Sequence, residues 1–159
     1  MHLMSTPKDI VHPGQIRPLK VKNAALITLR QHQDARGPIA IIGQGDAPLP
    51  FIPNRLFLTY AVSDATRGEH AHRHCEQLLL CVYGEVTVLL DDGTHAEEIT
   101  LRSPTEAVFI PAMVWAAQFA YSPHAVVLVA ASLPYNSEDY LRNKADWLAE
   151  LNAPSLGRE

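Results

Sequence analysis

The chain has 159 residues, of which 47% are hydrophobic, with two cysteines and a formal net charge of −4. This length suits one domain that buries its own core, and the interspersed charges argue against nucleic acid or an anionic membrane surface as a partner. No apolar run approaches the roughly 20 residues that cross a bilayer, and the first residues contain no apolar secretory segment. We therefore expect a cytoplasmic protein with no membrane partner.

Proline and glycine divide the chain into three parts. Residues 1–22 are polar, contain three prolines and are expected to form a flexible N-terminal arm. Residues 23–152 are the predicted domain, and residues 153–159 are its C-terminal tail. Within the domain, residues 43–53 contain two glycines and three prolines, which predicts a loop.

Short segments rich in β-branched and aromatic residues predict many strands. Strands at 24–29 and 38–42 are expected to form a hairpin around residues 34–37, and Asp91-Asp92-Gly93 predicts a second hairpin turn. The other strands are expected at residues 55–62, 77–83, 85–90, 96–101, 107–110, 115–120 and 125–131. This pattern indicates an all-β antiparallel sandwich or barrel.

One helix is predicted, near the C-terminus. It should begin near Asn136 and Ser137, whose side-chain oxygens can cap free amides. Apolar residues then recur at helical spacing, at Leu141, Ala145, Leu148 and Leu151. The two cysteines, Cys75 and Cys81, are too far apart along one extended segment to form a disulfide and are expected to be free thiols.

The stretch from Arg67 to Gln77 contains the sequence His70-Ala71-His72. Because side chains alternate along an extended chain, both imidazoles should project to the same side. Such a pair can bind a metal or move protons near neutral pH. The alternative is that both histidines lie on the solvated face of a strand.

The histidine pair, Gln77 seven residues before Gly84, and Pro111 four residues before Trp115 together resemble the cupin double-stranded β-helix, a jelly roll. In metal-binding cupins the position of Gln77 is a glutamate, and the position of Ala116 is a third histidine. A catalytic metal centre needs at least three protein ligands, and this chain keeps two. We therefore predict no metal.

A longer series of motifs resembles the dTDP-4-keto-6-deoxyglucose 3,4-ketoisomerases, the WxcM-like or FdtA-type sugar isomerases. The resemblance covers residues 24–148 in order. Its motifs are Asp34-x-Arg36-Gly37, Arg55-Leu56-Phe57, Arg67-Gly68-x-His70-Ala71-His72, Glu76-Gln77, Leu90-Asp91-Asp92-Gly93, Val114-Trp115 and Tyr135-x-x-x-Asp139-Tyr140-Leu141-Arg142.

This resemblance implies a cupin jelly roll with one C-terminal helix, assembled as a homodimer that exchanges N-terminal strands. It implies no cofactor. The implied reaction moves the carbonyl of a dTDP-linked keto-sugar from C4 to C3 through an enediol, in the biosynthesis of deoxyamino sugars. A neutral imidazole can remove the acidified proton at C3.

The resemblance favours His72 as the base and His70 as its partner, although either could be the base. Arg67 would orient the sugar or the diphosphate, whereas Arg55 and Arg36 are candidates for the diphosphate, since guanidinium groups match phosphate oxygens. The expected substrate-binding set is completed by Gln77, Tyr60 and Trp115.

The chain departs from the family at two positions that bear on activity. Leu58 replaces a usual tyrosine, for which Tyr60 is a possible substitute, and Ala116 stands where many members carry His or Arg. In the family, the Ala116 position and that of Pro38 vary with the C4 configuration of the product. Alternatives are therefore a non-catalytic sugar-nucleotide-binding cupin, an epimerase of a related dTDP-keto-sugar and, less specifically, a metal-dependent oxygenase.

Overall fold

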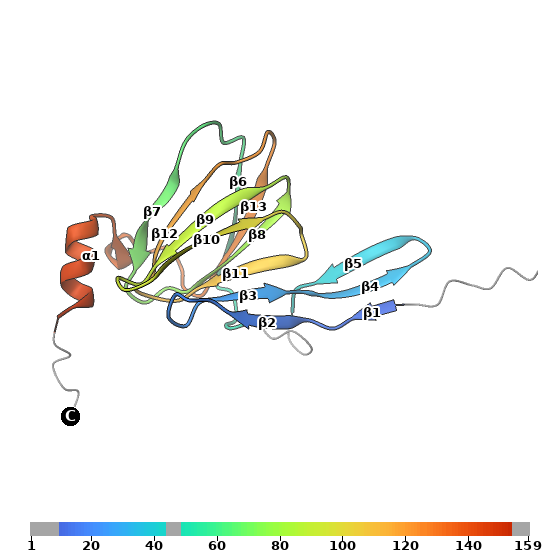
Figure 1. Cartoon of the computed structure of the whole chain (residues 1–159), viewed down its shortest axis with the longest axis horizontal. Coiled ribbons are helices and arrows are strands. Elements are labelled where there is room, and N and C mark those ends of the chain that lie inside the picture. Colours follow the sequence, from blue (N-terminus) through green and yellow to red (C-terminus); the bar gives the residue numbers. More distant parts are fainter. Residues whose placement is uncertain (1–9, 44–48, 154–159) are drawn as a thin grey trace, which may run out of the picture.

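The computed structural model describes residues 10–43 and 49–153, and its centre is a jelly roll of two facing antiparallel sheets (Figure 1). The order of the six-stranded sheet is β2 (Gln15–Pro18), β3 (Ala25–Thr28), β11 (Glu106–Ile110), β8 (Gln77–Tyr83), β13 (Val126–Ala131) and β6 (Arg55–Tyr60). The order of the five-stranded sheet is β10 (Ala96–Leu101), β9 (Val86–Asp91), β12 (Trp115–Phe119), β7 (Arg67–His72) and β14 (Tyr140–Leu141). The predicted all-β cupin fold is confirmed.

The hydrophobic core lies between the two sheets and follows from alternation along the strands. On β9, Val86, Val88 and Leu90 are fully buried, whereas the residues between them are half-buried. They pack against Leu79 and Cys81 of β8 in one cluster. Both cysteines are free and buried, as predicted.

A three-stranded sheet protrudes from the jelly roll, in the order β1 (Ile10–His12), β4 (Arg30–Asp34) and β5 (Gly37–Ile41) (Figure 1). The hairpin predicted around residues 34–37 is present, but its first strand is β4 and not residues 24–29. Strand β4 was not predicted, because its sequence is polar and contains no apolar run.

The predicted flexible arm contains two strands, β1 and β2, which the sequence reading missed. Strand β2 pairs with β3 at the edge of the six-stranded sheet, so this part of the arm belongs to the jelly roll. Residues 1–9 of the arm lie outside the described residues.

The helix begins later than predicted. Asn136 caps a single 3₁₀ turn, Ser137–Asp139, and the chain then extends into β14. Helix α1 runs over Lys144–Leu151 and is capped by Asn143, whose side chain accepts from two backbone amides. Leu141 therefore pairs with Ala71 of β7 instead of starting a helical stripe.

A buried tryptophan fixes α1 against the sheet. Trp147 is fully buried and packs its ring against Trp115, with ring centroids 5.6 Å apart. Its Nε1–H donates to the Met113 carbonyl over 2.8 Å. Over residues 10–43 and 49–153, no helix has the length and apolar character to span a membrane.

Candidate active site

A cavity of about 130 Å³ opens between the two sheets alongside β7. The six-stranded sheet contributes Phe57, Thr59, Gln77 and Val129. The five-stranded sheet contributes Arg67, Gly68, His70, Gln118 and Tyr140. One wall therefore carries an imidazole, a guanidinium, an amide and a phenol, and the other carries two apolar side chains, a hydroxyl and an amide.

A β-bulge in β7 aims His70 at this cavity. His70 pairs with Ala116 and Gly68 with Ala117, so Glu69 is the extra residue on β7. Gly68 and Glu69 both have positive φ, of 81° and 53°. A Cβ on Gly68 would meet the Ala116 carbonyl oxygen at 3.0 Å, so only glycine fits at this crossing.

His70 and His72 project to the same side of β7, as predicted from their spacing. Their Nε2 atoms lie 3.2 Å apart. His70 lines the cavity, whereas His72 lies deeper and is 6% exposed. The ring of Tyr140 packs on both imidazoles, with centroids 4.9 Å from His70 and 4.3 Å from His72.

The hydrogen bonds at both Nδ1 atoms define where the imidazole protons are. The carboxylate of Asp139 lies 3.0 Å from Nδ1 of His72, and the carbonyl of Gly68 lies 2.9 Å from Nδ1 of His70. Both oxygens only accept, so each Nδ1 carries the proton. Both Nε2 atoms are then free of protons in the neutral pair.

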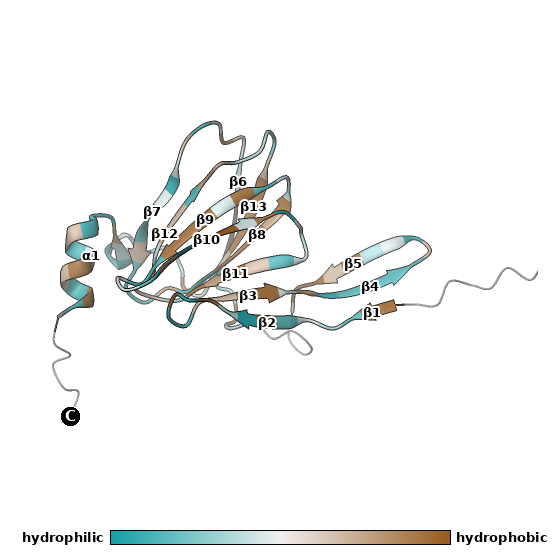
Figure 2. Cartoon of the chain, viewed as in Figure 1, coloured by the Kyte–Doolittle hydropathy of each residue, from teal (hydrophilic) through white to brown (hydrophobic). Residues whose placement is uncertain are grey.

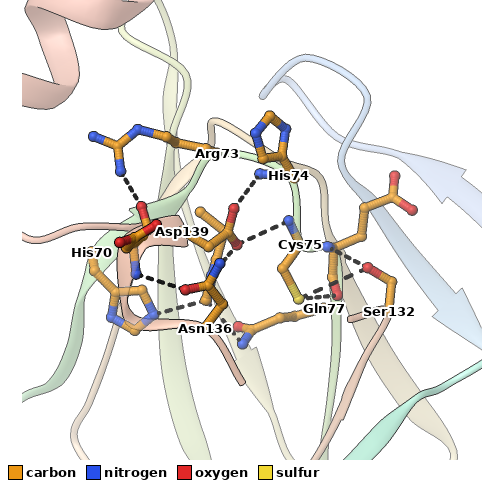
Figure 3. Close-up of polar contacts among 11 residues, drawn as sticks. His70, Arg73, His74, Cys75, Gln77, Ser132, Asn136 and Asp139 are labelled. Carbon is orange, nitrogen blue, oxygen red and sulfur yellow. Dashed lines mark hydrogen bonds and ion pairs between the residues drawn. The ribbon is translucent and has the colours of Figure 1, made fainter. Parts of the chain in front are cut away.

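Asp139 is buried and heavily hydrogen-bonded (Figure 3). Its carboxylate accepts from the backbone amides of His74, over 2.8 Å, and Cys75, over 3.1 Å, in addition to His72. Burial alone would raise the pKa of Asp139, but these donors together hold that pKa below its usual value. The carboxylate is therefore ionised when it orients His72.

Both imidazoles are held in the neutral form. Burial lowers the pKa of His72 to about 4, helped by the neighbouring His70 and opposed by Asp139. Burial also lowers the pKa of His70, opposed by its bond to Gly68 and helped by the charge of Arg142. A neutral Nε2 is a proton acceptor, so both rings can act as bases at neutral pH.

Gln77 also lines the cavity, and its role in substrate binding stays a prediction. The side-chain amide nitrogen of Gln77 lies 3.2 Å from Nε2 of His72. Because Nε2 of the neutral His72 ring carries no proton, the amide can donate a hydrogen bond to it. Gln77 occupies the position of a metal-binding glutamate in other cupins, and here it supplies a neutral amide. Among the described residues, one buried group of metal-ligand type, His72, Cys75 and Asp139, brings its ligand atoms within 4.8 Å of one another.

Two of the predicted arginines adjoin the cavity. Arg67 lines it and is exposed. Arg55 is the first residue of β6, and its guanidinium lies 5.1 Å from the ring of Phe57 and 5.5 Å from that of Tyr135. Its Nε is buried without a hydrogen-bond partner.

Three predicted site residues are not brought to the cavity within one chain. Tyr60 faces away from it, because it alternates with Thr59 on β6 and is 68% exposed. Trp115 packs against α1, since the inward side chains of β12 are Ala116 and Gln118. Arg36 lies at the β4–β5 turn, where it forms an ion pair with Asp34.

The sequence reading missed Asp139, Tyr140 and Gln118 as site residues. Asp139 and Tyr140 belong to a motif that resembles the family, but a helical interpretation of residues 136–151 hid their role. Gln118 shows one usable signal, since it lies two residues after Ala116 and must point to the same side of β12.

Comparisons with known proteins agree with this geometry. The family model described as WxcM-like, C-terminal (FdtA) matches residues 22–152. The TDP-4-oxo-6-deoxy-α-D-glucose-3,4-oxoisomerase of Aneurinibacillus thermoaerophilus is 32% identical over 136 residues, which are 83% of this chain and 97% of that protein.

Solved structures of similar proteins share the fold over most of both chains. A 3,4-ketoisomerase from Helicobacter canadensis is 29% identical with a TM-score of 0.78, covering 82% of this chain and 98% of that one. QdtA, a sugar 3,4-ketoisomerase from Thermoanaerobacterium thermosaccharolyticum in complex with TDP, is 32% identical with a TM-score of 0.76. The match covers 82% of this chain and 95% of that one. The match of the family model to residues 22–152 spans nearly the whole jelly roll, and the chain therefore belongs to the WxcM-like, C-terminal (FdtA) family.

Proposed function

We propose that this chain is a cofactor-independent isomerase that moves the carbonyl of a dTDP-4-keto-6-deoxyhexose from C4 to C3. The observation that carries the proposal is the neutral imidazole pair, with His72 oriented by Asp139 at a cavity between the sheets. The relatives named as 3,4-oxoisomerase and 3,4-ketoisomerase supply the reaction. A 3-keto product suits a later enzyme that installs an amino group at C3.

The proposed reaction needs only proton transfers. Nε2 of His72 takes the proton from C3, the C3–H electrons form the C3=C4 bond, and O4 gains a proton to give an enediol. O3 then loses its proton, the C3 carbonyl forms, and C4 takes a proton. C3 is thereby oxidised and C4 reduced within one molecule, so no external oxidant is required.

The 3.2 Å separation of the two Nε2 atoms suits this exchange. Once one Nε2 has accepted a proton, it can donate to the other, because both Nδ1 positions stay bonded to Gly68 and Asp139. We assign the base to His72, since the carboxylate stabilises its charged form. His70 relays protons among the sugar oxygens.

The diphosphate is assigned to Arg55 and Arg67 at the mouth of the cavity. The guanidinium groups of both residues are donors of the type that binds phosphate oxygens. Gln77 would bind the sugar at the floor, where its amide already contacts His72. A cavity of about 130 Å³ receives the keto-sugar, and the nucleotide would lie outside it.

We propose a homodimer in which the N-terminal strands are exchanged. The protruding sheet has hydrophobic residues on β1 and β5 (Figure 2). Of their side chains, Ile10 is 50%, Ile39 60% and Ile41 42% exposed. On the outer face of β6, Leu56 and Leu58 are 63% and 54% exposed. A small sheet with no core of its own is marginal in water, and a second copy would cover both surfaces.

Exchange would also give Arg36 a role. In one chain its side chain is 86% exposed at the tip of the protruding sheet. An exchanged arm could carry this guanidinium to the partner's cavity, where the sequence analysis expects a diphosphate ligand. The two free thiols accord with a reducing cytoplasm, and that location stays a prediction.

The direct test is incubation with dTDP-4-keto-6-deoxyglucose in deuterated water, followed by NMR of the sugar. Movement of the carbonyl to C3 with deuterium at C4 is the expected result. An unchanged sugar that nonetheless perturbs protein resonances would overturn the enzyme proposal in favour of a binding protein. Return of the 4-keto-sugar with altered stereochemistry would favour an epimerase.

The non-catalytic alternative rests on Ala116 alone. Ala116 faces inward beside His70. This chain therefore has a methyl group at a position where the resemblance expects a polar side chain, His or Arg. Leu58 does not support this alternative, because its side chain faces away from the cavity, opposite Leu128 on the outer surface of the sheet.

A further inference from the structure

Gln118 is the polar side chain that β12 contributes to the cavity. Ala116 and Gln118 point to the same side of the strand, because side chains alternate along an extended chain. Ala116 supplies a methyl group, whereas Gln118 is half-buried and lines the cavity with an amide. The proton transfers described above give this amide no part.

A buried tyrosine holds the amide in one orientation. The hydroxyl of Tyr121 donates to Oε1 of Gln118 over 2.8 Å. The Tyr121 ring packs against the core cluster between the sheets, so its position is fixed. Burial raises the pKa of Tyr121 to about 12, against the opposing charge of Arg67. The phenol therefore keeps its proton near neutral pH and remains a donor to Oε1.

This bond determines which part of the amide a ligand meets. A glutamine amide has one acceptor oxygen and two N–H donors. Because Tyr121 already occupies Oε1, the donors on Nε2 of Gln118 are the groups available to a ligand in the cavity. The amide does not titrate near neutral pH, so it can bind and orient a ligand but cannot act as its acid or base.

The register of β12 against β7 places Gln118 relative to the other polar groups. Gln118 lies opposite Arg67, and Ala116 lies opposite His70, about 7 Å away along β12. A ligand that extends from the imidazoles to Arg67 therefore passes beside the amide. Arg67 is exposed whereas Gln118 is half-buried, so the amide meets the more deeply bound part of the ligand.

We propose that Gln118 is a substrate-binding residue, whose amide nitrogen donates to an oxygen of the keto-sugar, and that Tyr121 is the residue that positions this amide. The inference rests on the proposed ketoisomerase function and deepens it by naming a neutral sugar-binding group. It requires no assumption about which face of the sugar meets the histidines.

Gln118→Met tests the binding role, because it removes the amide from a side chain of similar length. We expect kcat/KM for dTDP-4-keto-6-deoxyglucose to fall about tenfold, mainly through KM, whereas the calorimetric Kd of dTDP alone should stay within about twofold. Gln118→Leu provides the same test if the methionine variant does not fold. An unchanged kcat/KM in a folded variant would overturn the inference. An equal loss of affinity for dTDP would place the amide at the diphosphate and overturn the assignment to the sugar.

Tyr121→Phe tests the positioning role. Removal of the hydroxyl frees the amide to rotate, so we expect kcat/KM to fall about threefold in the wild type and not to change further in the Gln118→Met background. Tyr83→Phe is the control, since this tyrosine is 64% exposed on β8. An equal effect of Tyr121→Phe in both backgrounds would show a structural role and overturn the positioning assignment.

NMR of the sugar in the same samples separates this inference from the proposed function. If the wild type does not move the carbonyl, the isomerase proposal fails, and the calorimetric Kd of the keto-sugar nucleotide then takes the place of kcat/KM. Binding about tenfold weaker in Gln118→Met would still support the assignment, whereas equal binding would overturn it. A wild type that neither isomerises nor binds this nucleotide would overturn both proposals.

Discussion

Asp139 couples the histidine pair to the rest of the structure. It accepts from His72 and from two backbone amides, and it is 7% exposed. These three hydrogen bonds fix both the tautomer and the angle of the His72 ring only if the carboxylate keeps its charge. Asp139 acts through His72 and does not line the cavity, so it is a positioning residue.

We expect Asp139→Asn to lower kcat by roughly 10²-fold or more, since the neutral amide no longer stabilises the protonated imidazole. Loss of the Asp139 carboxylate should also move the acid limb of the rate profile to lower pH, because this carboxylate raises the pKa of His72. Steady-state kinetics across pH measure both effects. Asp146→Asn, on the exposed surface of α1, is the matched control. Unchanged kcat and pH profile in Asp139→Asn would refute the positioning role.

The pH dependence of the wild type follows from the same residues. Burial lowers the pKa of His72 to about 4, so its base form persists down to that pH. The acid limb of kcat/KM should therefore lie nearer pH 4 than 6.5. The unfolded chain binds protons at the histidines below about pH 6.5, so the free energy of unfolding should fall between 6.5 and 4. An acid limb at or above pH 6.5 would contradict this assignment.

At the scale of elements, strand β7 determines the site through its bulge. Two consecutive residues with positive φ turn the chain so that His70 still faces inward beside Ala116. No strand was predicted over β7, but the shared direction of the two imidazoles was, because it follows from alternation along any extended segment. The sequence could not predict the bulge, which depends on how closely β12 approaches.

Gly68→Ala tests the bulge. An added Cβ would lie 3.0 Å from the Ala116 carbonyl oxygen at a φ of 81°, so we expect destabilisation by more than about 1 kcal/mol and a loss of activity as His70 shifts. Thermal or urea unfolding measures the loss of stability, and turnover of the keto-sugar measures the loss of activity. Gly43→Ala, where nothing lies within 4 Å, is the control and should unfold as the wild type does. Equal stability of the two variants would contradict the account.

The later elements show why part of the site was not predictable. The segment 136–151 has helical apolar spacing, yet its first half forms a 3₁₀ turn and β14. Pairing with β7 and burial of Leu141 outweigh the local periodicity. Asp139 and Tyr140 reach His72 only through this long-range pairing, so spacing along the chain gave no direct sign of them.

At the scale of the whole molecule, the jelly roll was predictable and the arm was not. Core strands such as β8 and β10 have the predicted bounds, because β8 is a continuous apolar run and β10 follows the predicted Asp92-Gly93 turn. Strands β1 and β2 are exposed and β4 is polar and mostly half-buried, since none of the described residues covers them fully. Their burial pattern would be complete only in the proposed dimer.

We expect Leu58→Asp to shift the protein from dimer to monomer, because it places a charge in the apolar surface on the outer face of β6. Sedimentation velocity measures the change. Leu148→Asp is the control, since this leucine is 36% exposed on α1, at the opposite end of the molecule from the protruding sheet (Figure 1). A monomeric wild type, or a dimer unaffected by Leu58→Asp, would contradict the proposed assembly.

The central claim is that a neutral His72 removes the proton from C3 of a keto-sugar. The most direct measurement is loss of deuterium from dTDP-4-keto-6-deoxyglucose labelled at C3, followed by NMR for the wild type, His72→Asn and His70→Asn, with the exposed His74→Asn as the control. We predict that wild type and His74→Asn release the label while His72→Asn retains it in a folded protein. Release of the label by His72→Asn at the wild-type rate would contradict the account.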